Sequence, residues 1–187
     1  MHLDRRTAEG LAFLAAFALC IPAANWLIGN AGTTCLPNNG PCLIPVAPGL
    51  KAPSGVLMIG LALVLRDLVQ RRLGLRWSFA AIVAGTALSA LIAPPALVIA
   101  SAAAFLISEL ADLAVYTPLQ QRGLVLAVVA SSAAGLVVDS IVFLMLAFGS
   151  LDYLAGQIVG KAWMVLLVIP LIAWLRRRDE RLGLTPA

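Results

Sequence analysis

The stretch LVLAVVASSAAGLVVDSIVFLMLAF, residues 124–148, has one charged side chain, Asp139, among its 25 positions. An α-helix needs about 20 apolar residues to cross the hydrocarbon core of a bilayer, so this stretch predicts a membrane-spanning helix. The whole chain is also strongly apolar, because 61% of its 187 residues are hydrophobic and 12% are charged. A soluble domain has about 25% charged residues. This composition excludes an ordinary soluble enzyme, a disordered protein and a nucleic-acid-binding domain.

Apolar stretches on both sides of this segment bring the predicted spans to six. The third span is short, and Pro94-Pro95 separates it from the fourth, because proline cannot continue a helix without loss of a backbone hydrogen bond. We therefore expect an all-α, polytopic membrane protein whose single domain, residues 1–187, is a six-helix transmembrane bundle. The predicted spans are residues 11–29, 52–69, 78–93, 95–116, 124–148 and 154–175.

The orientation follows from the arginines and lysines between the spans, because cytoplasmic segments carry an excess of both residue types. With the N-terminus inside, ten arginines fall in cytoplasmic segments and Lys51 is the one cation in an external loop, while Arg66 and Lys161 lie within spans. Both termini are therefore expected in the cytoplasm. The ten arginines are Arg5, Arg6, Arg71, Arg72, Arg76, Arg122, Arg176, Arg177, Arg178 and Arg181.

Residues 30–51 form the one long connection, which this orientation places outside the cell. Its prolines and glycines predict that regular structure is absent there. Within CLPNNGPC, Cys35 and Cys42 could form a disulfide if the external side is oxidising, or could remain two unpaired thiols. Cys20, in the apolar first span, is expected to be a packing residue.

Charged side chains inside the spans are the strongest functional signal, because each costs about 2.5–3.5 kcal/mol at the bilayer centre and such groups commonly mark substrate or ion paths. Depth along the helices predicts that Asn25, Asp139 and Lys161 line an outward-facing pocket, with Glu109 and Asp112 as its floor. The polar groups within the spans are Asn25, Arg66, Asp67, Glu109, Asp112, Asp139 and Lys161.

Helical spacing supports this interpretation. Phe105, Glu109, Asp112 and Tyr116 share one face of the fourth span, and Gln157 and Lys161 share a face of the sixth. Small residues recur at every fourth position before Asp112 and again before Asp139, a pattern that lets helix backbones approach closely. Trp163 is the tryptophan that could stack on a flat ligand. The competing hypothesis is structural: Asp139 with Lys161, and Arg66 with Glu109 or Asp112, could be ion pairs that only stabilise the bundle.

At these residues the chain resembles the queuosine-precursor transporters, also called the vitamin-uptake-like VUT family. The resemblance covers residues of about 20 to 176, although the long first loop is not a feature that we associate with the family. The segments that carry it are Asn25-Trp26, LRDLVQRRLG with Asp67 and Arg71, SELADLAVYTPLQQR with Asp112 and Tyr116, ASSAAGLVVDSIVFLMLAFGS with Asp139, and Lys161.

The resemblance implies a compact six-helix bundle in the cytoplasmic membrane that imports 7-cyano-7-deazaguanine or 7-aminomethyl-7-deazaguanine. The substrate-binding residues expected on these grounds are Asn25, Asp67, Phe105, Glu109, Asp112, Tyr116, Asp139, Gln157, Lys161 and Trp163. The partners expected are a deazapurine base and the lipid bilayer, without nucleic acid.

Three alternatives stay open at this point. The chain could be the substrate-binding subunit of an energy-coupling-factor vitamin transporter, which needs a separate ATPase module, or it could form a homo-oligomer. An intramembrane enzyme is disfavoured, because the one histidine is His2 and no nucleophile or zinc motif occurs. A purely structural membrane protein would leave the excess of carboxylates unexplained. No cofactor, catalytic residue or metal site is expected.

Overall fold

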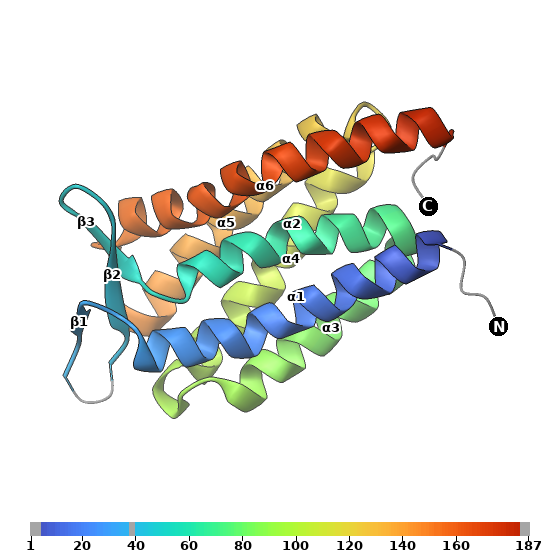
Figure 1. Cartoon of the computed structure of the whole chain (residues 1–187). Helices are drawn as coiled ribbons and strands as arrows, with labels where there is room; N and C mark the ends of the chain where they lie inside the picture. Colours follow the sequence, from blue (N-terminus) through green and yellow to red (C-terminus); the bar gives the residue numbers. More distant parts are fainter. Residues whose placement is uncertain (1–4, 38–39, 184–187) are drawn as a thin grey trace.

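The computed structural model describes residues 5–37 and 40–183. Six long α-helices run alternately in opposite directions and pack side by side (Figure 1). Helix α1 begins and helix α6 ends at one end of the bundle, and a small β-sheet lies at the other end (Figure 1). The helices are α1 Arg5–Asn30, α2 Val56–Leu73, α3 Leu75–Ile92, α4 Val98–Leu119, α5 Leu124–Phe148 and α6 Leu154–Leu182.

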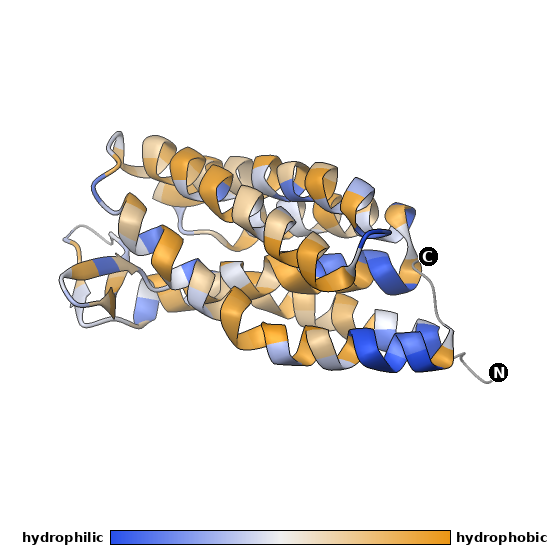
Figure 2. Cartoon of the chain, turned by 90° about the horizontal axis from the view of Figure 1, so that it is seen from above, coloured by the Kyte–Doolittle hydropathy of each residue, from blue (hydrophilic) through white to orange (hydrophobic). Residues whose placement is uncertain are grey.

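Five of these helices, all except α2, are long and apolar enough to cross a membrane. Their outer faces carry exposed large apolar side chains such as Leu91, Ile99 and Leu167, which are 84%, 77% and 68% exposed. Water would not tolerate so much exposed apolar surface on a monomer, but lipid does. Figure 2 shows the hydrophobic residues spread over most of the helices and hydrophilic residues gathered near the chain ends. The fold therefore fits an all-α membrane protein.

Helix α2 lies inside the bundle, where it packs against α1, α3, α4, α5 and α6. Its 18 residues would extend about 27 Å at 1.5 Å per residue, close to the thickness of the hydrocarbon core. Its charged side chains, Arg66, Asp67, Arg71 and Arg72, are all buried against protein and do not face lipid. That α2 is a sixth span stays a prediction, as do the sides of the membrane on which the termini lie.

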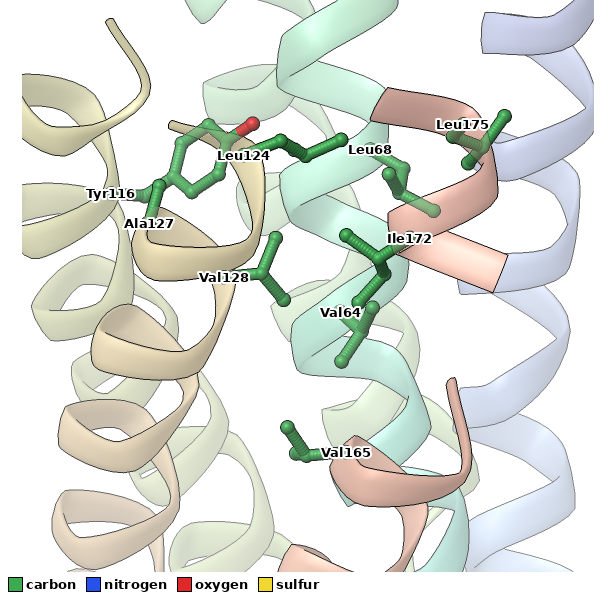
Figure 3. Close-up of a cluster of buried hydrophobic side chains, with 9 residues drawn as sticks. All are labelled: Val64, Leu68, Tyr116, Leu124, Ala127, Val128, Val165, Ile172 and Leu175. Atoms are coloured by element: carbon green, nitrogen blue, oxygen red, sulfur yellow. The ribbon is translucent and has the colours of Figure 1, made fainter. Parts of the chain in front are cut away.

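The largest apolar core joins α2 to its neighbours (Figure 3). Val64 and Leu68 of α2 lie between Val128 of α5 and Ile172 of α6, and all four are buried. The remaining residues of this cluster are Tyr116, Leu124, Ala127, Val165 and Leu175. Because α2 supplies the centre of the cluster, the position of its polar residues along the bundle is set by this packing.

The connection between α1 and α2 corrects the expectation of an irregular loop. It forms an antiparallel sheet of three strands in the order β1 Thr34–Cys35, β2 Cys42–Ala47 and β3 Leu50–Pro53. Pro37 and Pro41 lie outside the strands, and the register shifts between Pro45 and Ala47, so the missing proline N–H groups remove little of the ladder. Gly49, at φ 74°, supplies the left-handed residue that the turn between β2 and β3 needs.

Two further sequence expectations can be compared with this region. Cys35 and Cys42 are paired across β1 and β2 and form a disulfide, while Cys20 is free and buried. Helix α2 begins at Val56, four residues after the predicted start of the second span, because Ala52 and Pro53 belong to β3. The predicted break at Pro94-Pro95 is confirmed: α3 ends at Ile92, and the short 3₁₀ helix η1, Pro95–Leu97, precedes α4.

Candidate functional site

A pocket lies in the half of the bundle next to the sheet, between α1, α2, α3, α4, α5 and α6. Its empty volume is about 520 Å³, a figure that includes the open mouth. Pro53 of β3 and Gly55 form part of its wall, so the sheet adjoins the pocket. Its polar lining residues are Asn25, Ser89, Ser101, Asp139, Gln157 and Lys161.

Lys161 is the centre of the polar wall. Its ammonium is 2.5 Å from Asp139 Oδ2 and donates to Gln157 Oε1 at 2.5 Å and to Ser140 Oγ at 2.8 Å. These three contacts use all three N–H donors of the lysine. A ligand carbonyl can therefore reach the ammonium only if it replaces one of these partners.

Asp139 keeps more capacity to bind a ligand than Lys161 does. Its Oδ2 pairs with Lys161, but its Oδ1 accepts only a long hydrogen bond, 3.5 Å, from Ser108 Oγ of α4. The residue is 6% exposed, so the carboxylate reaches the pocket while most of it stays within protein. A ligand that offers two adjacent N–H groups would therefore find an acceptor here.

The apolar part of the pocket lining includes the ring of Phe105. Its ring packs on the ring of Phe17 of α1, with 5.9 Å between the centroids, and the side chain is 3% exposed. Gly85 of α3 makes room for it: a Cβ at Gly85 would lie 2.8 Å from Phe105 Cζ. An aromatic ligand could stack on this fixed ring.

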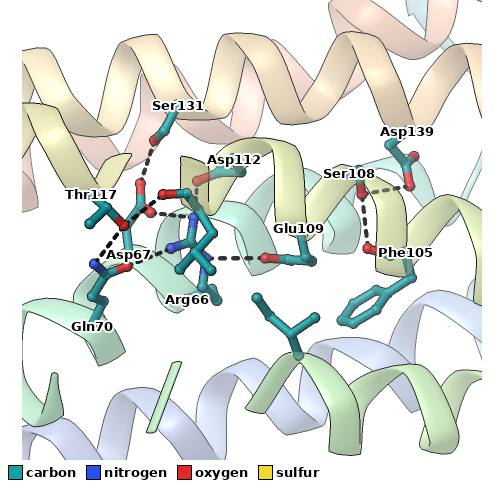
Figure 4. Close-up of polar contacts among 12 residues, drawn as sticks. Arg66, Asp67, Gln70, Phe105, Ser108, Glu109, Asp112, Thr117, Ser131 and Asp139 are labelled. Carbon is teal, nitrogen blue, oxygen red and sulfur yellow. Dashed lines mark hydrogen bonds and ion pairs between the residues drawn. The ribbon is translucent and has the colours of Figure 1, made fainter. Parts of the chain in front are cut away.

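A second polar site, the Arg66 cluster, lies deeper in the bundle and consists of Arg66, Asp67, Gln70, Glu109 and Asp112 (Figure 4). Arg66 Nη2 pairs with Asp67 Oδ1 at 2.7 Å and with Asp112, and its Nε donates to Glu109 Oε2 at 3.2 Å. Its Nη1 donates to Gln70 Oε1 at 3.0 Å. No member of the cluster is more than 1% exposed.

Groups around the Arg66 cluster hold its acids in place. Ser131 Oγ of α5 donates to Asp67 Oδ2 at 2.7 Å, and Gln70 Nε2 donates to Thr117 Oγ1 at 3.1 Å. The guanidinium lies over the ring of Tyr116, 5.6 Å from its centroid. Three helices, α2, α4 and α5, therefore meet here through buried polar groups.

The structure thus divides the sequence-predicted site residues into two groups and one outlier. Asn25, Phe105, Asp139, Gln157 and Lys161 line the pocket. Asp67, Glu109, Asp112 and Tyr116 surround Arg66, and the expected pocket floor of Glu109 and Asp112 is not what the structure shows, because neither lines the pocket. Trp163 is 50% exposed and donates to the Val46 carbonyl at 3.0 Å. A direct binding role for each of these residues stays a prediction.

Sequence reasoning missed several residues of these sites. Phe143 lines the pocket one helical turn after Asp139, so the spacing alone could have found it. Ser131 belongs to the small-residue pattern before Asp139, but the pattern explained close packing and gave no sign of its bond to Asp67. Ser140 and Gln70 carried no signal, because one serine or glutamine in a helix has many uses.

A third set of charges joins α1, α2 and α6 at the opposite end from the sheet. Asp179 of α6 accepts from Arg71 Nε at 2.8 Å and from Arg72 Nη1 and Nη2 at 2.8 and 2.9 Å. Glu9 of α1 pairs with Arg72 at 3.1 Å and with Arg178 at 2.5 Å. Asp179 is fully buried. The arginines that indicated cytoplasmic segments in the sequence therefore also form ion pairs between helices.

The fold is that of a multi-pass membrane protein with a partly polar pocket between its helices. A protein-family model described as "Putative vitamin uptake transporter" matches residues 90–175, a little under half of the chain. The matched segment contains Phe105, Asp139, Gln157 and Lys161 of the pocket and both acids that α4 contributes to the Arg66 cluster. No curated protein and no solved structure matches the chain.

Proposed function

We propose that this protein is a transporter that imports a queuosine precursor, 7-cyano-7-deazaguanine or 7-aminomethyl-7-deazaguanine, across the cytoplasmic membrane. The observation that carries the proposal is the pocket, whose lining combines Asp139, Lys161 and Gln157 with an aromatic ring, Phe105. The match to an uptake-transporter family over this part of the chain supports transport over catalysis.

The chemistry of a deazaguanine fits the polar wall. The base presents N1–H and a 2-amino group side by side, and both can donate to the Asp139 carboxylate. Its O6 needs a donor, which Lys161 or the half-buried Asn25 amide can supply. In this arrangement the base bridges Asp139 and Lys161, so the direct ion pair between them opens when the substrate binds.

Specificity would come from the same groups. A base without the 2-amino group or the N1–H would leave the buried carboxylate without a partner, at a cost of about 1–3 kcal/mol. Phe105 would hold the flat ring through stacking, which does not distinguish one purine from another. The polar wall therefore selects the base, and the aromatic wall gives affinity.

The test is rescue of queuosine in transfer RNA. The host lacks precursor synthesis and its own transporter, and each of the two deazaguanines is supplied in turn. We expect wild-type protein to restore queuosine, Asp139→Asn to fail although it reaches the membrane, and the exposed control Asp152→Asn to behave as wild type. If neither compound restores queuosine although the wild-type protein reaches normal abundance in the membrane, the proposal is refuted.

The host also separates the two modes of transport. A substrate-binding subunit of an energy-coupling-factor transporter needs an ATPase module, whereas a transporter that works alone does not. We expect rescue in a host without such modules. Rescue that appears only when a module is supplied would favour the subunit function.

A further inference from the structure

The Arg66 cluster has more acids than its cation can neutralise. Asp67, Glu109 and Asp112 all contact Arg66, and across residues 5–37 and 40–183 no other cation forms an ion pair with any of them. If all three were ionised, the cluster would carry two uncompensated negative charges inside the bundle. An uncompensated buried charge costs several kcal/mol even after relaxation of the protein.

Charged groups on the neighbouring helices do not supply the missing compensation. On α2 itself, Arg71 is occupied by Asp179, and on α6, Lys161 is occupied by Asp139. Helix α5 faces the cluster with Ser131, and α1 faces it with the thiol of Cys20 near Glu109. Arg76 of α3 is exposed at the end of the bundle.

Two carboxylate oxygens of the cluster lack a hydrogen-bond partner among the described residues. Asp112 Oδ2 is buried without a hydrogen bond, and a Cβ built on Gly135 of α5 would lie 3.1 Å from it. Asp67 Oδ1 lies 2.7 Å from Arg66 Nη2 but lacks hydrogen-bond geometry. A proton on one of these oxygens would remove a charge and turn an acceptor into a donor.

We propose that the Arg66 cluster is a proton-binding site: it holds at least one proton at neutral pH and exchanges it as the transporter works. A proton fits this site better than a metal ion, because within the described segments no three His, Cys, Asp or Glu side chains are placed to hold one. The proton enters from the external side, forms an O–H bond with a cluster carboxylate, and leaves that oxygen towards the cytoplasm. No electron transfer is involved.

The cluster and the pocket are held by the same two helices, which gives the proton a means to act on transport. On α5, Ser131 contacts Asp67, Gly135 adjoins Asp112, and Asp139 lies in the pocket. On α4, Glu109 of the cluster directly follows Ser108, whose Oγ is 3.5 Å from Asp139 Oδ1. A shift of Asp139 towards a bound base would therefore act on α4, which carries Glu109 and Asp112, and on α5, whose Ser131 contacts Asp67 (Figure 4).

Infrared spectroscopy tests the site without any substrate. In wild-type protein reconstituted in lipid at neutral pH, we expect the carbonyl-stretch band of a protonated carboxylic acid, which shifts in heavy water and declines as the pH is raised. Asp67→Asn and Asp112→Asn should weaken it, and Asp152→Asn, at the surface, should not. The aspartate variants could fail to fold, so the titration of the wild-type protein decides by itself. If the wild-type spectrum has no protonated-acid band, the proposal is overturned.

Uptake tests the exchange, and this arm rests on the proposed function. Proteoliposomes receive a pH gradient, acid outside, and one of the two deazaguanines. One pH unit is worth about tenfold in the accumulation ratio for each proton carried, so we expect an increase of that order that a protonophore removes. Accumulation that ignores the gradient overturns proton exchange and leaves the substrate proposal intact. A titrating band with no transport of either base supports the proton site and refutes the proposed substrate.

Discussion

Lys161 shows at the residue scale how a buried charge can be both structural and functional. Its three contacts, with Asp139, Gln157 and Ser140, explain why a lysine that is 1% exposed is tolerated within a bundle. The same contacts leave the lysine and the aspartate at the wall of a pocket, where a ligand can insert between them. The two functions make different predictions for single and double substitutions.

We expect Asp139→Asn and Lys161→Met each to weaken substrate binding by about 10–100-fold, because each removes a charge-assisted hydrogen bond worth about 1.5–3 kcal/mol. Initial uptake rates over a range of precursor concentrations measure this, with membrane abundance determined on the same samples. Asp152→Asn is the control for loss of an exposed carboxylate. If the Asp139→Asn, Lys161→Met double variant regains full uptake, the pair is structural and does not bind substrate.

At the scale of the element, α2 and α6 approach each other closely at Gly60. A Cβ on Gly60 would lie 2.5 Å from the Lys161 carbonyl oxygen and 2.8 Å from its Cα, so the obstacle is backbone and cannot rotate away. The glycine thus lets α6 bring Lys161 to the pocket. The pocket geometry depends on this contact as much as on the residues that line it.

We expect Gly60→Ala to destabilise the folded protein by about 1–3 kcal/mol, because α6 must move outward to accept the Cβ. Uptake should fall in the protein that still folds, since Lys161 moves with α6. Thermal unfolding in detergent and uptake in proteoliposomes measure the two effects. Gly29→Ala is the matched control, because a Cβ at Gly29 meets no atom within 4 Å; equal effects from both variants would reject the close-approach argument.

At the scale of the whole molecule, the bundle is closed by charges at one end and lies against the sheet at the other. Asp179 pairs with Arg71 and Arg72, and Glu9 pairs with Arg72 and Arg178. These ion pairs join α1, α2 and α6 at the end of the bundle opposite the sheet (Figure 1). The pocket adjoins the opposite, sheet-bearing end. The described helices are therefore joined by ion pairs at one end of the bundle and enclose a pocket near the other end.

We expect Asp179→Asn to destabilise the protein by about 3–5 kcal/mol, because it leaves buried Arg71 without its anion and buried Arg72 with Glu9 alone. Glu180→Gln is the adjacent control: Glu180 pairs with Arg176 at the surface, where both side chains are more than half exposed, and such a pair is worth about 0–1 kcal/mol. Membrane abundance and the unfolding temperature distinguish them. A loss as large in Glu180→Gln as in Asp179→Asn would contradict the assigned role of Asp179.

The orientation of the whole molecule can be tested at the disulfide. Ten arginines outside the spans against one external lysine predict that the sheet lies outside the cell and both termini inside. In a variant with Cys35 as its one cysteine, an impermeant maleimide should label intact cells. Labelling that occurs only after lysis would mean that the topology is inverted.

The sequence by itself determined the helices and the presence of costly buried charge. Apolar stretches of about 20 residues specify helices in lipid regardless of their neighbours, which is why the predicted spans coincide in position with α1 and α3 to α6, although α1 begins at Arg5 and α6 continues to Leu182, both beyond the predicted bounds. Depth along a helix also follows from the sequence, so Asn25, Asp139 and Lys161 could be assigned to one pocket before the fold was known.

Only the tertiary structure decided which neighbour each polar face meets. Helical spacing places Glu109 and Asp112 on one face of α4, but not whether that face turns to the pocket or to Arg66; packing around α2 turns it to Arg66. The sheet formed by residues 34–53 was missed for a similar reason, because its ladder depends on pairing between segments and not on local composition. Rotation of a helix and pairing of strands are set by contacts between distant residues, and these exist only in the folded chain.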